Sequence, residues 1–253
     1  MTYCVAVRLS HGLVMMSDTR TNAGVDNIST YRKLTTWEVE GDRAIALLGA
    51  GNLATTQALI SRLDERTKIP DERDPSLLQA PTMFQLATLI GNELRDVIAE
   101  QSSATNGSSG GATQMDPTFG ATMILAGQIA PGVPTIFMIY PEGNFVEVSE
   151  DTPFFQIGET KYGRPILLRA YDPDMSFDEA IRLLLISFDS TIKANLSVDL
   201  PIDWCLYDND SYQFADRGRV EISDSYFTTL SEDWGEALKR AVASMPEFSR
   251  ADD

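Results

Sequence analysis

Alternation of apolar and polar residues predicts a β-strand at the start of the chain. One face of residues 3–9 carries Tyr3, Val5, Val7 and Leu9, which is the period of two that a half-buried strand shows. A tight turn at residues 10–12 follows, and residues 13–16 are then apolar on both faces, as expected for a sheet that is covered on each side. The chain therefore begins with a hairpin whose second strand ends abruptly in polar residues.

The same patterns divide the rest of the chain into groups of strands and helices. Further strands are predicted at residues 31–37, 43–48, 119–129, 135–140, 144–149, 154–157, 202–207 and 220–223. Helices are predicted at residues 53–66, 82–101 and 162–171, after Ser176, and from Ser231 onward, and residues 21–30 are predicted to be a loop. Antiparallel strands in two groups, with helices between them, indicate an α+β fold in which two sheets stack between helical layers.

Two of these helices begin at predicted capping boxes. Thr82 is followed by Gln85, and Ser176 by Glu179, the spacing at which a side chain and a backbone N–H cap each other. The second helix has one apolar face made of Ile181, Leu184, Leu185, Phe188 and Ile192. That spacing is the helical repeat, so this helix is predicted to pack against a sheet.

Length and composition are typical of one folded unit. The chain has 253 residues, 43% of them hydrophobic, which is enough for a substantial core. We expect a single domain over residues 1–253. Residues 102–114 are rich in Ser, Gly and Thr and predict a flexible insert, and residues 246–253 form an acidic tail.

The charge of the chain excludes several classes of partner. A net charge of −17 opposes binding to nucleic acid or to an anionic membrane, since both require clustered Lys and Arg. No apolar run is long enough to span a membrane and no signal peptide is visible, so a cytoplasmic location is expected. Cys4 and Cys205 lie in predicted strands as reduced core thiols. No cofactor or metal site is predicted, because the turn at Asp208 and Asp210 has too few carboxylates for Ca²⁺.

The second residue suggests a hydrolytic chemistry. If the initiator Met1 is removed, Thr2 becomes the N-terminal residue. Its hydroxyl can then attack a carbonyl, while its α-amine, with a reference pKa of about 7.7–8.0, accepts the proton. This chemistry needs no histidine, and the only histidine, His11, is predicted at an exposed hairpin tip.

Four stretches of the chain resemble a known family. They are residues 17–24 (SDTRTNAG), 51–57 (GNLATTQ), 139–145 (IYPEGNF) and 156–163 (QIGETKYG). Together with Thr2 they are similar to the proteasome β-subunit family of N-terminal-nucleophile hydrolases, and most of all to its bacterial ancestral β-subunit branch, Anbu. The resemblance runs from Thr2 to about Leu206. It implies a four-layer αββα sandwich of two antiparallel sheets.

The resemblance also implies roles for individual residues. Thr2 matches the nucleophile and base, Lys33 the lysine that favours the attacking alkoxide, and Asp18 the aspartate that orients this lysine. Arg20 matches the basic residue that braces the neighbouring loop. The turn at residues 49–51 matches the segment whose backbone N–H faces the tetrahedral intermediate, with Ala50 or Gly51 as the donor.

Two positions depart from the family pattern. Glu159 follows Gly158 where proteasomal subunits have a serine, and Asn195 stands where they have an aspartate, two residues before Ser197. Asn195 brings no charge, and Glu159 is expected either to raise the pKa of the Thr2 amine or to pair with Lys33. Either effect would slow the attack.

The functional prediction is a threonine-type peptidase. The departures at Glu159 and Asn195 are compatible with a weak activity. The peptidase would cleave peptides or unfolded proteins inside rings or ring-like stacks of its own subunits. Apolar helix faces such as that of Trp234 would supply contacts between subunits or pack in the core. Two alternatives stay open: a non-catalytic assembly protein of the same fold, and a small-amide hydrolase.

Overall fold

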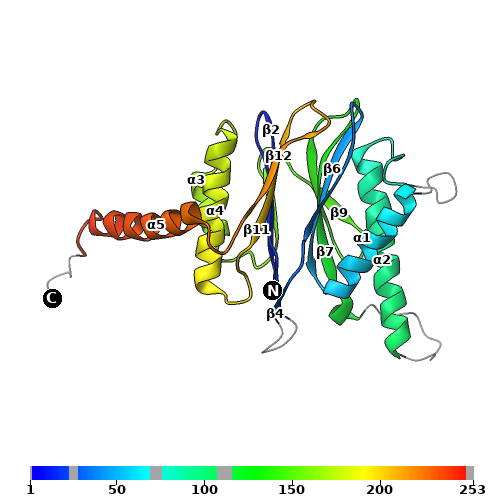
Figure 1. Cartoon of the computed structure of the whole chain (residues 1–253), viewed down its shortest axis with the longest axis horizontal. Coiled ribbons are helices and arrows are strands. Elements are labelled where there is room, and N and C mark those ends of the chain that lie inside the picture. The colour runs from blue at the N-terminus through cyan, green and yellow to red at the C-terminus, as the bar shows by residue number, and fades with distance from the viewer. Residues whose placement is uncertain (1, 23–27, 69–75, 107–115, 249–253) are drawn as a thin grey trace.

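Two five-stranded antiparallel sheets stack face to face between two pairs of helices in the computed structural model (Figure 1). The structure describes residues 2–22, 28–68, 76–106 and 116–248. The four layers, helices on sheet on sheet on helices, are those of the αββα sandwich that the sequence predicted.

The first sheet contains the N-terminal hairpin at its centre. In spatial order its strands are β10 (Phe154–Gly158), β1 (Tyr3–Arg8), β2 (Gly12–Asp18), β11 (Ile202–Asp208) and β12 (Phe214–Val220). β1 and β2 pair with Cys4 opposite Ser17. This register places Thr2 and Asp18 at the same end of the sheet, since residues at the start of one antiparallel strand lie beside the end of the next.

The second sheet is a meander of consecutive strands. In spatial order they are β5 (Leu34–Val39), β6 (Arg43–Gly51), β7 (Ala121–Ile129), β8 (Thr135–Ile139) and β9 (Phe145–Glu147). A separate two-stranded ribbon, β3 (Arg20–Asn22) and β4 (Ile28–Thr30), joins the two sheets. Lys33 lies in the short segment between the end of β4 and the start of β5, where the chain passes from the ribbon into the second sheet.

Four helices cover the outer faces of the sheets: α1 (Leu53–Lys68), α2 (Met83–Asn106), α3 (Arg164–Ala170) and α4 (Phe177–Ala194). A 3₁₀ turn η1 (Pro117–Phe119) precedes β7, and a fifth helix, α5 (Ser225–Ala243), follows β12. α1 and α2 lie on the second sheet, and α3 and α4 on the first (Figure 1). The predicted capping box of α4 is confirmed, because Ser176 and Glu179 each cap the other's backbone. At α2, Thr82 accepts a hydrogen bond from the Gln85 N–H.

The core divides into three layers of side chains. The layer between the sheets holds small and medium residues such as Ala46, Leu48 and Met15. Cys4 and Cys205 are both buried there as free thiols, and burial raises the thiol pKa of each. The predicted apolar face of α4 does pack against the first sheet, with Leu184, Leu185 and Phe188 fully buried.

Five sequence expectations about the elements were wrong. Residues 21–30, predicted as a loop, include strands β3 and β4 among the described residues, and β5 begins at Leu34 rather than at Tyr31. α2 continues to Asn106, through the first part of the predicted insert, whose residues 107–114 lie outside the described residues. The last strand ends rather than begins at Val220. α5 begins at Ser225 instead of Ser231, because Asp224 caps it by accepting a hydrogen bond from the Phe227 N–H.

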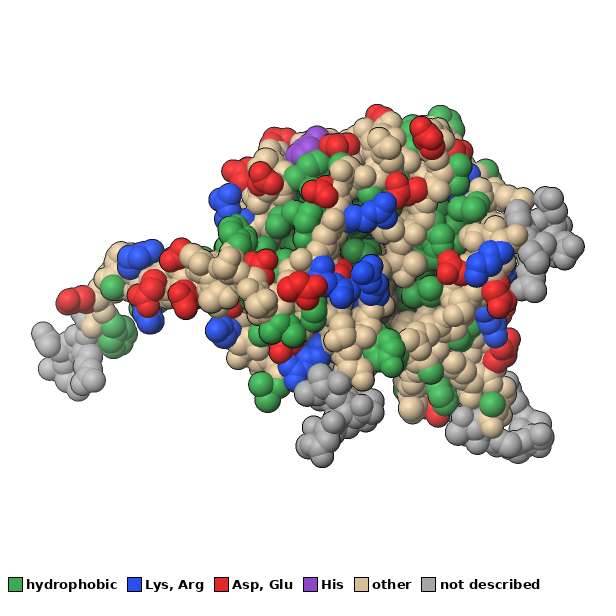
Figure 2. Space-filling view, in the orientation of Figure 1, with side chains coloured by type: hydrophobic (Ala, Val, Ile, Leu, Met, Phe, Trp, Pro, Cys, Tyr) green, Lys and Arg blue, Asp and Glu red, His purple; other side chains and the backbone are tan. Residues whose placement is uncertain are grey.

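α5 leaves the body of the molecule as an arm (Figure 1 and Figure 2). Phe227, in its first turn, is its only buried residue. Beyond it, Leu238 and Val242 are exposed, as are Met245 and Phe248 just after the helix. These apolar side chains therefore lie outside the three layers of the core.

Candidate active site

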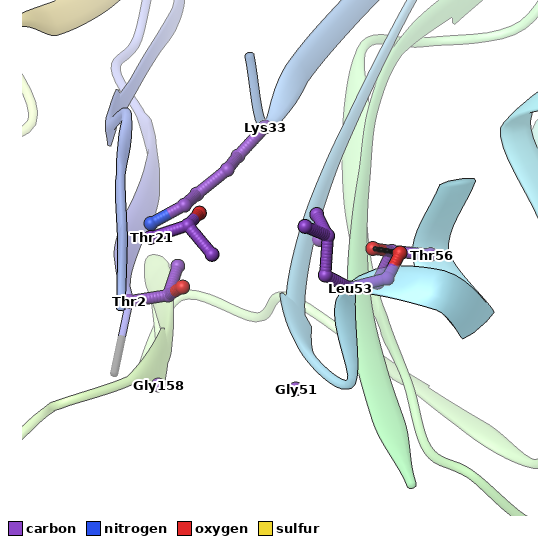
Figure 3. A pocket seen from close by; sticks show the side chains of 8 residues that line it. Thr2, Thr21, Lys33, Gly51, Leu53, Thr56 and Gly158 are labelled. Carbon is purple, nitrogen blue, oxygen red and sulfur yellow. Dashed lines mark hydrogen bonds between the residues drawn. The ribbon is translucent and has the colours of Figure 1, made fainter. Parts of the chain in front are cut away.

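A cavity of about 320 Å³ opens where the ends of the two sheets meet, beside Thr2 (Figure 3). Its lining comes from both sheets and from α1: Thr2, Thr21, Lys33, Gly49, Gly51, Leu53, Thr56 and Gly158. Thr2 and Lys33 point toward each other on one side, and Leu53 and Thr56 form the opposite wall (Figure 3). The structure therefore brings the predicted nucleophile and the predicted lysine into one cavity.

The backbone of Thr2 is held in place by the end of β10. The Glu159 N–H donates a 2.6 Å hydrogen bond to the Thr2 carbonyl oxygen. Gly158, just before it, has a φ of +83°, a conformation that residues with a Cβ rarely adopt. A Cβ built on Gly158 would lie 1.9 Å from that same oxygen. Glycine is required here both for its conformation and for the close approach of the two chains.

Replacing Gly158 by alanine should therefore destabilise the protein and move Thr2. The left-handed conformation and the clash together are expected to cost about 3 kcal/mol or more in the free energy of unfolding. Gly41→Ala is a matched control, because Gly41 has a φ of +71° but nothing within 4 Å of a built Cβ. It should cost only about 1 kcal/mol. Urea unfolding followed by circular dichroism measures both, and equal losses would show that the contact with Thr2 does not matter.

Asp18 and Lys33 form a buried ion pair beside Thr2. The Lys33 Nζ donates to Asp18 Oδ1 at 2.8 Å and to the Arg20 carbonyl oxygen at 2.6 Å. Asp18 Oδ1 also accepts a 2.9 Å hydrogen bond from the Tyr3 N–H. An ammonium has three N–H donors, so one donor of Lys33 is left to face the cavity. The pair fixes this ammonium relative to the backbone of the residue next to Thr2.

Burial controls the charge of Asp18. Its side chain is fully buried, and this loss of solvent raises the pKa of the carboxyl group to about 6, with the nearby Lys33 ammonium acting in the opposite direction. Above that pH Asp18 is a carboxylate and the ion pair is complete. Its Oδ2 is buried without a hydrogen-bond partner among the described residues, which is consistent with the raised pKa.

Arg20 joins the ribbon to the loop that precedes β11. Its guanidinium donates to Asp199 Oδ2 at 2.5 Å, while its backbone carbonyl accepts from Lys33. The sequence predicted a bracing role for Arg20, and the structure places it against this loop. Asp199 was not predicted, because a lone aspartate before a proline-containing turn carries no distinguishing pattern.

The glycine turn at residues 49–51 presents one backbone N–H toward the cavity. The Gly49 N–H is already donated to the Lys33 carbonyl oxygen at 3.1 Å. N–H groups alternate in direction along a strand, so that of Ala50 points to its neighbour Thr122 on β7, and that of Gly51 points to the same side as Gly49. Gly51 lies beyond the start of β5 and lines the cavity, whereas Ala50 does not. Of the two predicted donors, Gly51 is the one placed at the cavity.

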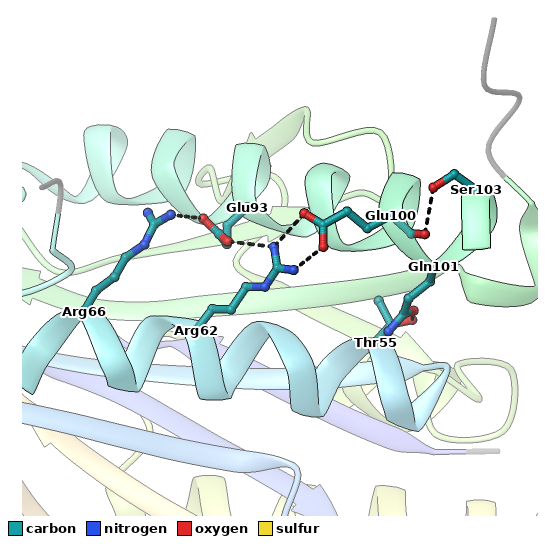
Figure 4. Close-up of polar contacts among 7 residues, drawn as sticks. All are labelled: Thr55, Arg62, Arg66, Glu93, Glu100, Gln101 and Ser103. Carbon is teal, nitrogen blue, oxygen red and sulfur yellow. Dashed lines mark hydrogen bonds and ion pairs between the residues drawn. The ribbon is translucent and has the colours of Figure 1, made fainter. Parts of the chain in front are cut away.

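α1, which follows this turn, is locked against α2 by buried charge (Figure 4). Arg62 and Arg66 both contact the buried Glu93 carboxylate, at 3.2 and 2.5 Å. Arg62 also pairs with Glu100. A carboxylate held between two guanidiniums has its charge compensated. The clamp fixes the helix that supplies Leu53 and Thr56 to the cavity wall.

Glu159 and Asn195 are joined to each other rather than to Lys33. The Asn195 Nδ2 donates to Glu159 Oε2 at 2.8 Å, and Asn195 Oδ1 accepts from the Ser197 N–H at 2.9 Å. Of the two effects expected of Glu159, the ion pair with Lys33 is not formed among the described residues: the Lys33 Nζ donates to Asp18 and to the Arg20 carbonyl oxygen, and the Glu159 carboxylate accepts from Asn195. None of Glu159, Asn195 and Ser197 lines the cavity. They form a polar layer behind the Thr2 backbone, which Glu159 reaches through its N–H.

Other candidates from the sequence lie away from the cavity. His11 is exposed in the hairpin turn and packs on Phe177. Asp210 Oδ1 accepts a 2.7 Å hydrogen bond from the Gln128 Nε2. Within the described residues no group of three or more His, Cys, Asp or Glu is arranged for a metal ion, and no helix there has the length and apolar character of a membrane span.

The chain is similar to proteasome subunits and to several solved Anbu structures. Residues 99–199 match the proteasome subunit family. A proteasome subunit beta of Haloquadratum walsbyi is 26% identical over 218 residues, 85% of this chain and 76% of that protein. A Gly-1 mutant of Anbu from Hyphomicrobium sp. strain MC1 is 43% identical over 99% of this chain and all of its own, with a TM-score of 0.88. Anbu, the ancestral beta-subunit, from Yersinia bercovieri is 41% identical over 98% of this chain and all of its own, also at 0.88. A structure described as the helical assembly of the Anbu complex from Pseudomonas aeruginosa is 40% identical over 98% of each chain, at 0.87.

Proposed function

The chain belongs to the proteasome β-subunit family, in its Anbu branch, and from this premise we propose that it is a threonine peptidase with Thr2 as its nucleophile. The observation that carries the proposal is the buried Asp18–Lys33 pair, which holds an ammonium in the same cavity as the Thr2 hydroxyl. A lysine in a surface strand would be solvated. Burying an ion pair is costly, and its position beside a hydroxyl favours a catalytic role.

The proposed reaction starts after Met1 is removed and proceeds through an ester. Thr2 Oγ1 attacks the carbonyl carbon of the peptide bond, and its proton passes to the free α-amine of the same residue. The tetrahedral intermediate collapses when the resulting ammonium protonates the leaving amine. A water molecule, deprotonated by the α-amine, then attacks the ester, releases the peptide acid and restores the Thr2 hydroxyl.

Lys33 and Gly51 are assigned to charge stabilisation in this scheme. The Lys33 ammonium lowers the free energy of negative charge on Thr2 Oγ1 as the proton leaves. The Gly51 N–H is the donor for the oxyanion of the tetrahedral intermediate, and one such donor typically contributes about 3–4 kcal/mol. Leu53 and Thr56 on the opposite wall would contact the substrate. Peptides or unfolded protein segments are the proposed substrates.

The reaction rate should depend on the ionisation of two groups, the α-amine of Thr2 and the carboxyl group of Asp18. The α-amine must be neutral to accept a proton, so the rate of the chemical step rises with pH up to its pKa, ordinarily about 7.7–8.0. Asp18 must be ionised to hold Lys33, and its pKa is about 6. The logarithm of the rate should therefore rise with a slope of about two below pH 6 and about one between pH 6 and the amine pKa. Reaction rates with an electrophile for N-terminal threonine, from pH 5 to 9, measure this. A single slope throughout would exclude Asp18 from the reaction.

A non-catalytic assembly protein is the second candidate function. Asn195, which stands where the family has an aspartate, places a neutral amide against Glu159 behind Thr2. The carboxylate that the family has at position 195 is therefore replaced by a neutral amide, and this change favours a protein that keeps the fold while hydrolysing little. Turnover of small amides without turnover of peptides would instead favour the small-amide hydrolase.

Self-association is proposed to use the projecting α5. The Anbu complex of Pseudomonas aeruginosa forms a helical assembly, and α5 carries Trp234, Leu238 and Val242 at helical spacing on a segment that its own chain leaves uncovered. A second copy of this chain is the proposed occupant of this face. Ring-like or helical stacks would both follow from such head-to-tail contacts.

Charged residues on this face should weaken the assembly. The double variant Leu238→Asp, Val242→Asp is expected to raise the dissociation constant about tenfold or more, because two apolar contacts would be replaced by buried charges. Val133→Asp is the control, since Val133 is as exposed as Val242 but lies in the β7–β8 turn. Sedimentation velocity over a range of protein concentrations distinguishes them. An unchanged distribution of species for the double variant would remove α5 from the interface.

Intact-mass measurement of the protein purified from its own cells tests the proposed peptidase. The proposal predicts a mass that lacks the initiator methionine, which leaves Thr2 with a free amine. A mass that retains Met1 throughout would contradict the proposal and favour the assembly protein.

A further inference from the structure

A second cavity, of about 300 Å³, lies between the open edges of the two sheets. β5 is the edge strand of one sheet and β12 that of the other. Both contribute to the walls, with Arg32 and Leu34 on one side and Arg217 and Arg219 on the other. Figure 2 shows Lys and Arg side chains gathered around a hollow between the sheets. We call this cavity the arginine slot.

The arginine slot is separate from the Thr2 cavity but shares a strand end with it. Lys33 lines the Thr2 cavity, while its neighbours Arg32 and Leu34 line the slot. Neighbouring residues of an extended chain point in opposite directions. The two cavities therefore lie on opposite sides of the same short segment, and the slot takes no part in the proposed attack on the peptide bond.

The charges of the arginine slot are incompletely balanced. Arg219 is paired with Asp203 by two hydrogen bonds, at 2.6 and 2.9 Å. Arg217 contacts Glu38 at 3.0 Å. Arg32 is exposed and has no hydrogen bond or ion pair with any residue that the structure describes. Glu221 also acts on Arg219, so Arg32 is the guanidinium of the slot that has no partner among the described residues, in a chain whose net charge is −17.

The apolar part of the arginine slot is Leu34, on the edge strand β5. The indole of Trp204 lies on the other face of the first sheet, where it packs with the core beneath the helices and against Gly218. Successive side chains of a strand point to opposite faces of a sheet, so Arg217 and Arg219, on either side of Gly218, face the slot. Guanidiniums bind carboxylates and phosphates through paired N–H groups, which makes the slot suited to an anion.

We propose that the arginine slot binds a small anion that carries two or more negative charges, either a phosphate or a polycarboxylate. Arg32 supplies the unpaired charge. Arg217 is the second contact, because its side chain is 60% exposed in the pair with Glu38, and an ion pair open to solvent is weak enough to exchange partners. An anion with a single charge would gain little by displacing Glu38 from Arg217, since one negative charge would only replace another. A polyvalent anion engages Arg32 and Arg217 together.

Calorimetric titration of the full chain with inorganic phosphate, and separately with citrate, tests the proposal. At low ionic strength one of the two should bind saturably, and which one does so identifies the ligand chemistry. Arg32→Gln and Arg217→Gln should each weaken binding about tenfold or more, as expected for loss of a charged hydrogen bond. Arg169→Gln is the matched control, because Arg169 is an exposed arginine on α3. Thr2→Ala should bind as the parent does, so the result does not depend on peptidase activity.

Three outcomes would overturn the proposal. The first is the lack of saturable binding of either anion to the parent protein. The second is equal affinity in the parent, Arg32→Gln and Arg217→Gln, provided that thermal unfolding shows the variants to be folded. The third is equal weakening by Arg169→Gln, which would show that only the overall surface charge affects binding.

Discussion

Thr2→Ala should abolish reaction with an electrophile selective for N-terminal threonine. The variant removes the only hydroxyl that shares its residue with the prospective α-amine, and loss of a nucleophile typically lowers the rate by about 10⁴-fold or more. Thr2 is half-buried in the cavity wall and its backbone is fixed by Glu159. The substitution should therefore leave the fold and its stability nearly unchanged.

Two further variants make this result specific. Thr2→Ser keeps the hydroxyl and should retain most of the labelling. Thr21→Ala removes the other threonine hydroxyl on the same side of the cavity (Figure 3), and it should label as the parent does. Labelling of Thr2→Ala at the parental rate would show that another residue reacts.

Lys33→Met should affect both stability and reactivity. It leaves Asp18 buried without its ion-pair partner, and removing one member of a buried pair typically costs about 3–5 kcal/mol in the free energy of unfolding. The pKa of Asp18 would then rise above its present value of about 6. The folded state would hold this proton more tightly than the unfolded state, so stability would fall as pH rises. Urea unfolding at pH 5 and pH 7.5 should show the larger deficit at pH 7.5.

The double variant Asp18→Asn, Lys33→Met separates the two roles of the pair. It removes both charges, so much of the lost stability should return. Labelling of Thr2 should not return, because the ammonium that favours the alkoxide is still missing. If the electrophile labels Thr2 of the double variant at the parental rate, the ion pair has a structural role only.

Much of the architecture could be predicted from the sequence, because its strongest patterns are long. The hairpin of β1 and β2, the helix α4 and the stacking of two sheets all follow from hydrophobic periodicity over whole elements. The errors fall on short or polar elements. β3 and β4 have three residues each, too few to show alternation. β12 is an edge strand with exposed charged residues, which edge strands tolerate and which made it look like a turn.

The sequence predicted which residues form the site, but not which of them contact one another. Thr2, Asp18 and Lys33 were identified by resemblance, and the structure places Thr2 and Lys33 at one cavity with Asp18 paired to Lys33. The partner of Glu159 could not be read from the chain, since Asn195 lies at the end of a helix 36 residues away. Choosing Gly51 over Ala50 required the register of β6 against β5 and β7. Such pairings depend on tertiary geometry that a linear pattern does not encode.

Mapping the position of the electrophile on the protein tests the central claim most directly. The parent protein, treated with the electrophile and digested, should yield a modified N-terminal peptide that begins at Thr2 and carries the adduct on that residue. An adduct on any other residue, or an N-terminal peptide that still begins with Met1 and is unmodified, would contradict the account.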